Sequence, residues 1–186
     1  MKKFALIAVC ALACASSFAQ GTINFNNLTG VSQPVFESDG ATKLAGAAYT
    51  AELYAGLLGA NTDAQMTAVA TSPFKSGGFF LGGSQAVPGY AFGSTAVSFQ
   101  VRVWRTSDGA SYAAAAGTPG AHVGESTIFN LGAGSALGGG GAPPATPGNL
   151  LGFTSFNLSV VPVVPEPATL ALGALGVAAL LIRRKK

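Results

Sequence analysis

Residues 97–105 alternate strictly between two kinds of side chain, and this pattern constrains the fold more than any other segment of the chain. Val97, Phe99, Val101 and Val103 fall on one face, whereas Ser98, Gln100, Arg102 and Trp104 fall on the other. A period of two is that of a β-strand with one face toward a core. Asp108-Gly109, shortly afterwards, has the composition of a turn. We therefore expect a half-buried strand that is followed by a turn.

Short runs of similar character recur along the chain, between clusters of Gly, Pro, Asn, Asp and Ser. They lie at residues 22–26, 34–37, 48–54, 66–71, 78–81, 126–130 and 153–161. Short strands separated by turn residues are typical of an all-β sandwich, so we expect a single antiparallel β-sandwich domain over residues 20–160. The four alanines within Ser111–Ala116 favour a short helix, which ends before Gly117 and Pro119.

One stretch of this domain, residues 131–148, has an unusual composition. Ten of its eighteen residues are glycine or proline. Such a composition disfavours a regular strand, because glycine has no side chain to pack and proline lacks the N–H that a sheet needs. The sequence predicts a long mobile surface loop between two parts of one domain.

The N-terminal 19 residues have the pattern of a secretory signal peptide. Lys2 and Lys3 precede an apolar run, and small residues follow it at the positions that a signal peptidase reads. We expect cleavage between Ala19 and Gln20. Both cysteines of the chain, Cys10 and Cys14, lie in this segment, so the exported body has no thiol for a disulfide, a nucleophile or a metal.

The net charge of the body differs from that of the whole chain. The formal charge of +3 comes from cations at the two ends, whereas residues 20–164 carry four cations and six carboxylates, a net charge of −2. A mildly acidic body lacks the basic surface that nucleic-acid binding requires. We therefore expect no nucleic-acid partner.

Residues 161–186 form a tail of three parts. A proline-rich spacer comes first, then an uncharged apolar segment at residues 168–182, and last the basic cluster Arg183, Arg184, Lys185 and Lys186. We expect a short transmembrane helix of marginal length, because fifteen helical residues span about 22 Å, against about 30 Å for the hydrocarbon core. The basic cluster is expected to stay in the cytoplasm and to stop transfer of the segment.

The tail resembles the PEP-CTERM sorting domain of exported proteins from Gram-negative bacteria. The resemblance rests on Val164, Pro165, Glu166 and Pro167, on the apolar segment that follows, and on the basic cluster. It implies recognition and removal of the tail by an exosortase, a membrane transpeptidase, in addition to cleavage of the N-terminal segment by signal peptidase. It also implies an inner-membrane intermediate and a destination at the cell surface or in the extracellular matrix, in association with exopolysaccharide.

The two prolines of the motif, Pro165 and Pro167, fix the backbone on both sides of Glu166, and this favours an extended conformation that an enzyme can recognise. The body loosely resembles the exported all-β bodies that precede such tails.

Catalytic and metal-binding residues are sparse. His122 is the single histidine, and it lies in a glycine-containing segment that we expect to be a surface loop. No Gly-x-Ser-x-Gly segment supplies an activated serine. The carboxylate pairs Glu37 with Asp39, and Asp108 with Glu125, are formal candidates for glycoside hydrolysis, although residues of this kind more often lie in solvated turns. We expect no catalytic residues, no metal site and no cofactor.

Glycan binding is the specific activity that the residues favour most. Trp104 lies on the face of its strand that is opposite the expected core, where its ring could stack on a sugar, and Tyr90 or Tyr112 could extend that surface. Packing of Trp104 under a loop is the other interpretation, and for this ring it is the one that we favour. Three functions therefore remain: a structural surface or matrix protein of biofilm, which we favour, a carbohydrate-binding module, and a secreted glycan hydrolase.

Overall fold

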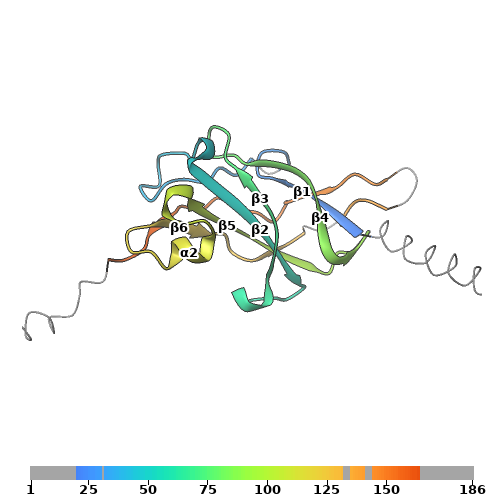
Figure 1. Cartoon of the computed structure of the whole chain (residues 1–186). Coiled ribbons are helices and arrows are strands. Elements are labelled where there is room, and N and C mark those ends of the chain that lie inside the picture. The colour runs from blue at the N-terminus through green and yellow to red at the C-terminus, as the bar shows by residue number, and fades with distance from the viewer. Residues whose placement is uncertain (1–19, 31, 132–134, 141–143, 164–186) are drawn as a thin grey trace, which may run out of the picture.

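The computed structural model describes residues 20–30, 32–131, 135–140 and 144–163 of the 186-residue chain. These residues form an all-β body with little helix (Figure 1). Its strands are β1 (Gln20–Asn26), β2 (Tyr49–Leu57), β3 (Thr67–Pro73), β4 (Leu81–Ala91), β5 (Val97–Arg105), β6 (His122–Glu125), β7 (Phe129–Asn130), β8 (Gly148–Asn149) and β9 (Ser159–Val160). The helical elements are α2 (Tyr112–Ala116) and the single 3-10 turns η2 (Gly46–Ala48), η3 (Asp63–Gln65) and η4 (Thr106–Asp108).

The larger of the two sheets has the strand order β3-β2-β5-β6-β9, with β7 also paired to β5. Strands β2 and β5 form an uninterrupted antiparallel ladder from the pair Tyr49 and Arg105 to the pair Leu57 and Val97. This ladder runs along the middle of the body (Figure 1). The alternating segment of the sequence is therefore the central strand of the larger sheet, and the predicted bounds of this strand, residues 97–105, are confirmed.

The smaller sheet has the order β4-β1-β8 and is not wholly antiparallel. β1 pairs with β4 in the antiparallel sense, whereas Ile23 and Asn24 pair with Gly148 and Asn149 of β8 in the parallel sense. The prediction of a purely antiparallel sandwich is wrong at this pair. The reason is that the Gly/Pro-rich segment folds back on itself, with Gly139 paired to Ala145, so the chain reaches β1 from the end where Gln20 lies and runs in the same direction as β1.

The main hydrophobic core joins inward-facing residues of both sheets. Its members include Ile23 and Phe25 of β1, Leu53 of β2, Val87 of β4, and Phe99 of β5, all at 0% exposure. Phenylalanine rings from loops complete it, and they pack edge to face, as in the pair Phe80 and Phe153 with centroids 5.9 Å apart. The arrangement is sandwich-like, with two sheets around one core.

Strand β5 is buried on both faces, so the prediction of a half-buried strand is wrong. Every residue from Val97 to Trp104 is buried. The face that carries Val97 meets the main core, whereas the opposite face is covered by α2, by η3 and by a second apolar cluster. That second cluster consists of Trp104, Ala115, Ala121 and Val123, with Tyr112 and Val161 against it. A central strand in a sheet that is covered on both sides has no solvent-facing side chains.

The described part of the Gly/Pro-rich segment is fastened to β1, which corrects the expectation of a mobile surface loop. The backbones of Thr22 and Gly138 exchange two hydrogen bonds, of 3.0 and 2.8 Å. Leu137 is 1% exposed and belongs to the main core. Glycine is required at this crossing because a Cβ atom at Gly138 would lie 2.5 Å from the Cα atom of Pro147. Residues 135–140 and 144–148 extend together at the end of the body where Gln20 lies (Figure 1).

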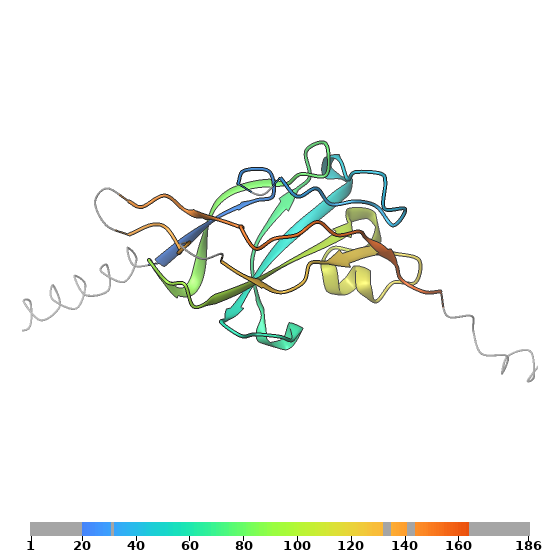
Figure 2. The ribbon, with the colours of Figure 1, turned by 180° about the vertical axis from the view of Figure 1, so that it is seen from behind.

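The chain enters and leaves the described body at opposite ends, as both views show (Figures 1 and 2). Residue 20 lies at the end with the Gly/Pro-rich segment, and residue 163 lies at the end with α2 and β6. The predicted helix at residues 111–116 is confirmed as α2, whose N-cap Ser111 accepts a hydrogen bond from the N–H of Ala114. At this end β9 pairs with β6, His122 opposite Val160.

Other strand predictions vary in outcome. The runs at residues 22–26, 48–54 and 66–71 correspond to β1, β2 and β3. The run at 34–37 contains isolated bridges at Phe36 and no strand, and the run at 78–81 contains the bridge at Phe80 and the first residue of β4. The runs at 126–130 and 153–161 shorten to β7 and β9. Sequence analysis missed β4 and β6 because Gly82, Gly83, Pro88, Gly89 and Gly124 interrupt their patterns.

Candidate functional site

Glu37 is the centre of a polar cluster at the end of the body where the chain exits. The residue follows the bridge at Phe36, and its side chain is 12% exposed. Its carboxylate accepts hydrogen bonds from the Tyr49 hydroxyl, from Nη2 of Arg105 at 3.2 Å and from the Ser38 N–H at 3.1 Å, and it lies 2.8 Å from Nδ1 of His122. Tyr49, Arg105 and His122 come from β2, β5 and β6. The carboxylate therefore joins a loop to three strands.

The protonation of Glu37 follows from these contacts. Burial alone raises the pKa of its carboxyl, but the hydrogen bonds from Tyr49, His122, Ser38 and Arg105 outweigh burial and lower the pKa to about 2. A carboxylate with this pKa stays ionised at neutral pH and cannot act as a general acid there. The expectation that Glu37 is a solvated turn residue is wrong, because the fold uses it as an internal anion.

His122 lies on β6 and is half-buried, so the expectation of a loop residue at the surface is also wrong. Its backbone N–H donates to Oδ2 of Asp108 at 2.7 Å. Asp108 is therefore tied to the start of β6, whereas Glu125 lies at the end of that strand near Arg102. Asp39 has a local role as well, because it accepts hydrogen bonds from the N–H groups of Ala41 and Thr42. The candidate carboxylates are all engaged in holding the backbone or a side chain.

Arg102 forms a second polar cluster on the covered face of β5. Its guanidinium carbon lies 4.1 Å from the ring centroid of Tyr54 and 5.5 Å from that of Tyr112. The Asp63 carboxylate lies 2.8 Å from Nη2, although not in line with its N–H bonds, and Glu125 lies 3.8 Å from Nε. Burial, followed by the charge of Glu125, raises the pKa of Tyr112 to about 12. The arginine thus compensates carboxylates around a pair of half-buried tyrosines.

Trp104 lies beneath α2 and does not present a face to solvent. The residue is 4% exposed, and its Nε1–H donates to the carbonyl oxygen of Gly109 at 2.9 Å. The ring packs, which is the interpretation favoured from the sequence, and the candidate contact of Trp104 with a sugar is therefore wrong. Tyr112 packs in the same cluster. Tyr90 packs against the main core, so the three aromatic residues do not form one surface.

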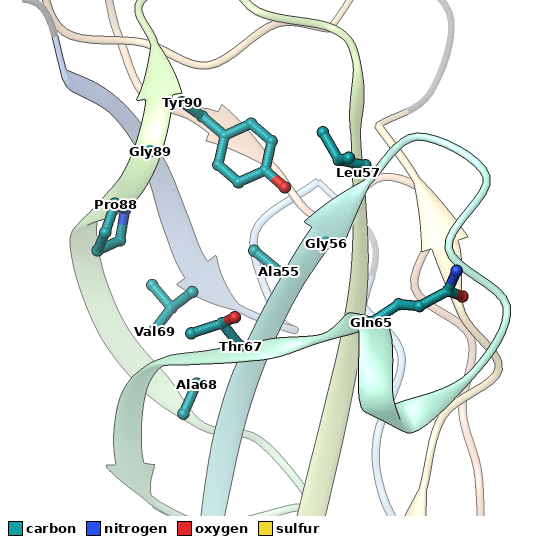
Figure 3. A pocket seen from close by; sticks show the side chains of 10 residues that line it. All are labelled: Ala55, Gly56, Leu57, Gln65, Thr67, Ala68, Val69, Pro88, Gly89 and Tyr90. Carbon is teal, nitrogen blue, oxygen red and sulfur yellow. The ribbon is translucent and has the colours of Figure 1, made fainter.

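Tyr90 lines an open groove of about 320 Å³. The groove lies between β2, the segment from Gln65 to Val69, and the end of β4 (Figure 3). The Tyr90 ring reaches from β4 toward Leu57 on β2 (Figure 3). Burial raises the pKa of its hydroxyl, so this group is neutral and able to donate a hydrogen bond. The remaining lining is Ala55, Gly56, Gln65, Thr67, Ala68, Val69, Pro88 and Gly89.

Sequence reasoning missed two partners of Glu37, Tyr49 and Arg105. They are cross-strand neighbours in the β2–β5 ladder, so a correct pairing of the two predicted strands would have found this pair. It also missed the groove, because most of its lining residues lie on β3 and β4 and are small or apolar. Among the described residues, no cluster of three or more His, Cys, Asp or Glu side chains has the geometry to hold a metal ion.

The comparison with known families concerns the tail. The family described as the PEP-CTERM protein-sorting motif matches residues 163–185. The chain carries a PEP-CTERM sorting motif. The matched segment contains Val164, Pro165, Glu166 and Pro167, and it includes Arg183, Arg184 and Lys185 of the basic cluster. The motif indicates an exported protein that is processed at the membrane by an exosortase-type enzyme.

The match is confined to the tail, and the β body has to be interpreted from its own geometry. No curated protein and no solved structure matches the chain. Residues 164–186, with the sorting motif and the expected helix at 168–182, lie outside the described residues, as does the expected signal peptide at 1–19 with Ala19. In the part of the chain that the structure describes, no helix has the length and apolar character to cross a membrane.

Proposed function

We propose that the chain is an exported cell-surface or extracellular-matrix protein with a structural or interaction role in an exopolysaccharide-containing biofilm. In this proposal the β body is not an enzyme and is delivered through removal of its tail by an exosortase-type transpeptidase. The observation that carries the proposal is the sorting motif at residues 163–185. The body that precedes this motif has no cysteine between residues 20 and 163.

The polar clusters of the body support a structural role. Glu37 and Asp108 accept hydrogen bonds from the protein itself, and the pKa of Glu37 is about 2. A hydrolase of the two-carboxylate kind needs one carboxyl group that is protonated near neutral pH. Glu37 does not meet this requirement, which supports the structural role over the secreted glycan hydrolase.

Mass spectrometry of the protein from its native host tests the proposal, because the two true termini report export and tail removal together. A start at Gln20 and loss of the segment that follows the sorting motif are the expected result. Glu166→Ala should retain the tail, while Glu125→Gln, a change of another glutamate in the body, should be processed normally. Full-length protein in the cytoplasm would contradict the proposal.

Carbohydrate binding is a second candidate function, and the Tyr90 groove is the feature that favours it. The groove combines a half-buried tyrosine ring, the apolar side chains of Pro88 and Val69 and the hydroxyl of Thr67. Sugars bind to such surfaces by stacking on the ring and by hydrogen bonds from a few polar groups. The ligand class that fits is a neutral or weakly charged polysaccharide of the matrix.

Titration of the purified body with exopolysaccharide from the host tests this second function. Tyr90→Ala should abolish binding, and Tyr90→Phe should retain most of it because the ring remains. Trp104→Phe is the matched control, since that ring is buried elsewhere. Unchanged binding by Tyr90→Ala would exclude the groove as the sugar site.

A further inference from the structure

The folded body fixes the backbone up to Val161, four residues before Pro165 of the sorting motif. The Val161 N–H donates to the carbonyl oxygen of Ala121 at 2.8 Å, and the Gly120 N–H donates to the carbonyl oxygen of Val161 at 2.9 Å. The Val161 side chain also packs against the cluster that contains Trp104. The folded domain therefore extends through residue 161, and the first residues of the proline-rich spacer are part of it.

The distance that remains is short. Four residue steps separate Val161 from Pro165, and an extended chain covers them in about 14 Å. Seven steps separate Val161 from Ala168, where the apolar run begins, and they span about 25 Å at most. The headgroup layer occupies about 5–8 Å of this distance when Ala168 is at the hydrocarbon boundary. Roughly 18 Å therefore remains between the headgroups and the body. This gap is wide enough for one helix of about 10–12 Å diameter and too narrow for two stacked helices.

The surface around residue 163, where the chain leaves the body, allows another protein to come close. We define the exit face as residues 113–120, from α2 to the turn that meets Val161, together with β9. Residues 116–120, Ala-Gly-Thr-Pro-Gly, are exposed, small and uncharged. This face lies at the end of the body opposite residue 20 (Figures 1 and 2). It offers neither long side chains nor like charge to repel a partner.

We infer that the exit face lies against the membrane-embedded transpeptidase while the tail is removed, and that the docking of Val161 and β9 sets the reach of the sorting motif. The inference rests on the proposed sorting function. Because Leu158 is 3% exposed and donates from its N–H to the Phe36 carbonyl oxygen, it is the next anchor when β9 separates from β6. Separation adds three residues, or about 10 Å, to the spacer without disturbing the main core.

A length series in the full chain, expressed in the native host, tests the inference. Deletion of Pro162 and Val163 shortens the reach of Pro165 to about 7 Å. We expect the fraction of processed protein to fall about tenfold or more, since ångström-scale misplacement of a reacting group has effects of this size. The double substitution Pro162→Gly with Val163→Gly is the matched control, because it changes the same residues and keeps the length. It should be processed like the wild type.

A second substitution, which should restore processing of the shortened chain, makes the test specific for β9. Val161→Pro removes the N–H that bonds Ala121, and it should restore processing to the shortened chain by releasing β9. Unchanged melting temperatures of the purified bodies of the deletion and control variants establish that the fold is intact. Normal processing of the shortened chain, or failure of Val161→Pro to restore it, overturns the inference alone. An unprocessed wild type overturns the proposed function as well, so the two failures are distinguishable.

Discussion

Nδ1 of His122 lies 2.8 Å from Oε2 of Glu37, although the two residues are 85 positions apart in the sequence. The contact joins the loop after Phe36 to the first residue of β6, next to the strand from which the chain leaves the body. Because Tyr49 and Arg105 donate to the same carboxylate, one glutamate holds together four segments that are distant in sequence. Cohesion at this end of the body depends on it.

Replacement of Glu37 should destabilise the body. Glu37→Gln removes the charge that His122 and Arg105 face, and it leaves a half-buried guanidinium without its partner. We expect the free energy of unfolding to fall by about 2 kcal/mol. Urea denaturation followed by tryptophan fluorescence measures this directly. Glu125→Gln, at a carboxylate that is 44% exposed, is the control and should change it by under about 1 kcal/mol. Equal effects of the two substitutions would contradict the central role of Glu37.

The stability of the body should depend on pH in the acid range. The pKa of Glu37 is about 2 in the folded state, against a usual value of 4.5. The folded state therefore binds a proton less readily than the unfolded state, so the stabilisation is complete above pH 4.5 and is lost as the pH falls toward 2. The full loss is about 3 kcal/mol. Unfolding curves at a series of pH values should show this decline in the wild type. A decline of the same size in Glu37→Gln would show that other groups cause it.

Truncation of Trp104 should affect folding and not sugar binding. Trp104→Ala removes the ring from the cluster beneath α2 together with its hydrogen bond to Gly109, and it should cost about 3–5 kcal/mol of stability. Trp104→Phe keeps most of the apolar contact and should cost about 1–2 kcal/mol. Circular dichroism melting curves distinguish the two. If Trp104→Phe instead kept full stability and lost affinity for exopolysaccharide, the assignment of the ring to the interior would be wrong.

Loss of Leu137 should release the Gly/Pro-rich segment from β1. The side chain is 1% exposed in the main core, so Leu137→Ala should cost about 2–4 kcal/mol. Limited proteolysis and amide hydrogen exchange over residues 135–148 should both become faster, because this leucine fastens the segment to the body. Leu151→Ala is the matched control, since Leu151 is 43% exposed. Exchange rates in the segment that did not change in Leu137→Ala would show that the backbone hydrogen bonds to Thr22 are sufficient.

The sequence predicts local structure well where one interaction decides it. The period of two in residues 97–105 located β5, and the four alanines after Ser111 located α2. The motif at residues 163–185 was identified from its own residues, because its chemistry is contained in a contiguous segment. In each case the deciding information lies within a few neighbouring positions.

Features that depend on distant partners were not predictable in this way. Packing of Trp104 was favoured, but the segment that covers it, α2, could not be named from its own strand, and the role of Glu37 depends on side chains from three strands. Leu137 is in the core because its neighbouring glycines let the backbone come close to β1. From composition alone, the same glycines predict a flexible loop. The Tyr90 groove arises from the relative positions of β2, β3 and β4, and no single segment indicates it.

The opposed positions of residues 20 and 163 have a mechanical consequence. A force applied between the two ends acts on β1 at one end and on β9 at the other. β1 is held by a ladder to β4 from Gln20 to Asn26, whereas the C-terminal attachment consists of the short β9–β6 pairing at Ser159 and Val160 and the two backbone hydrogen bonds of Val161. Under tension the short strand should separate first, because it is held by fewer hydrogen bonds than β1. The body therefore yields by a few residues at its C-terminal attachment and absorbs a small extension there, while both sheets around the phenylalanine-rich interior stay closed.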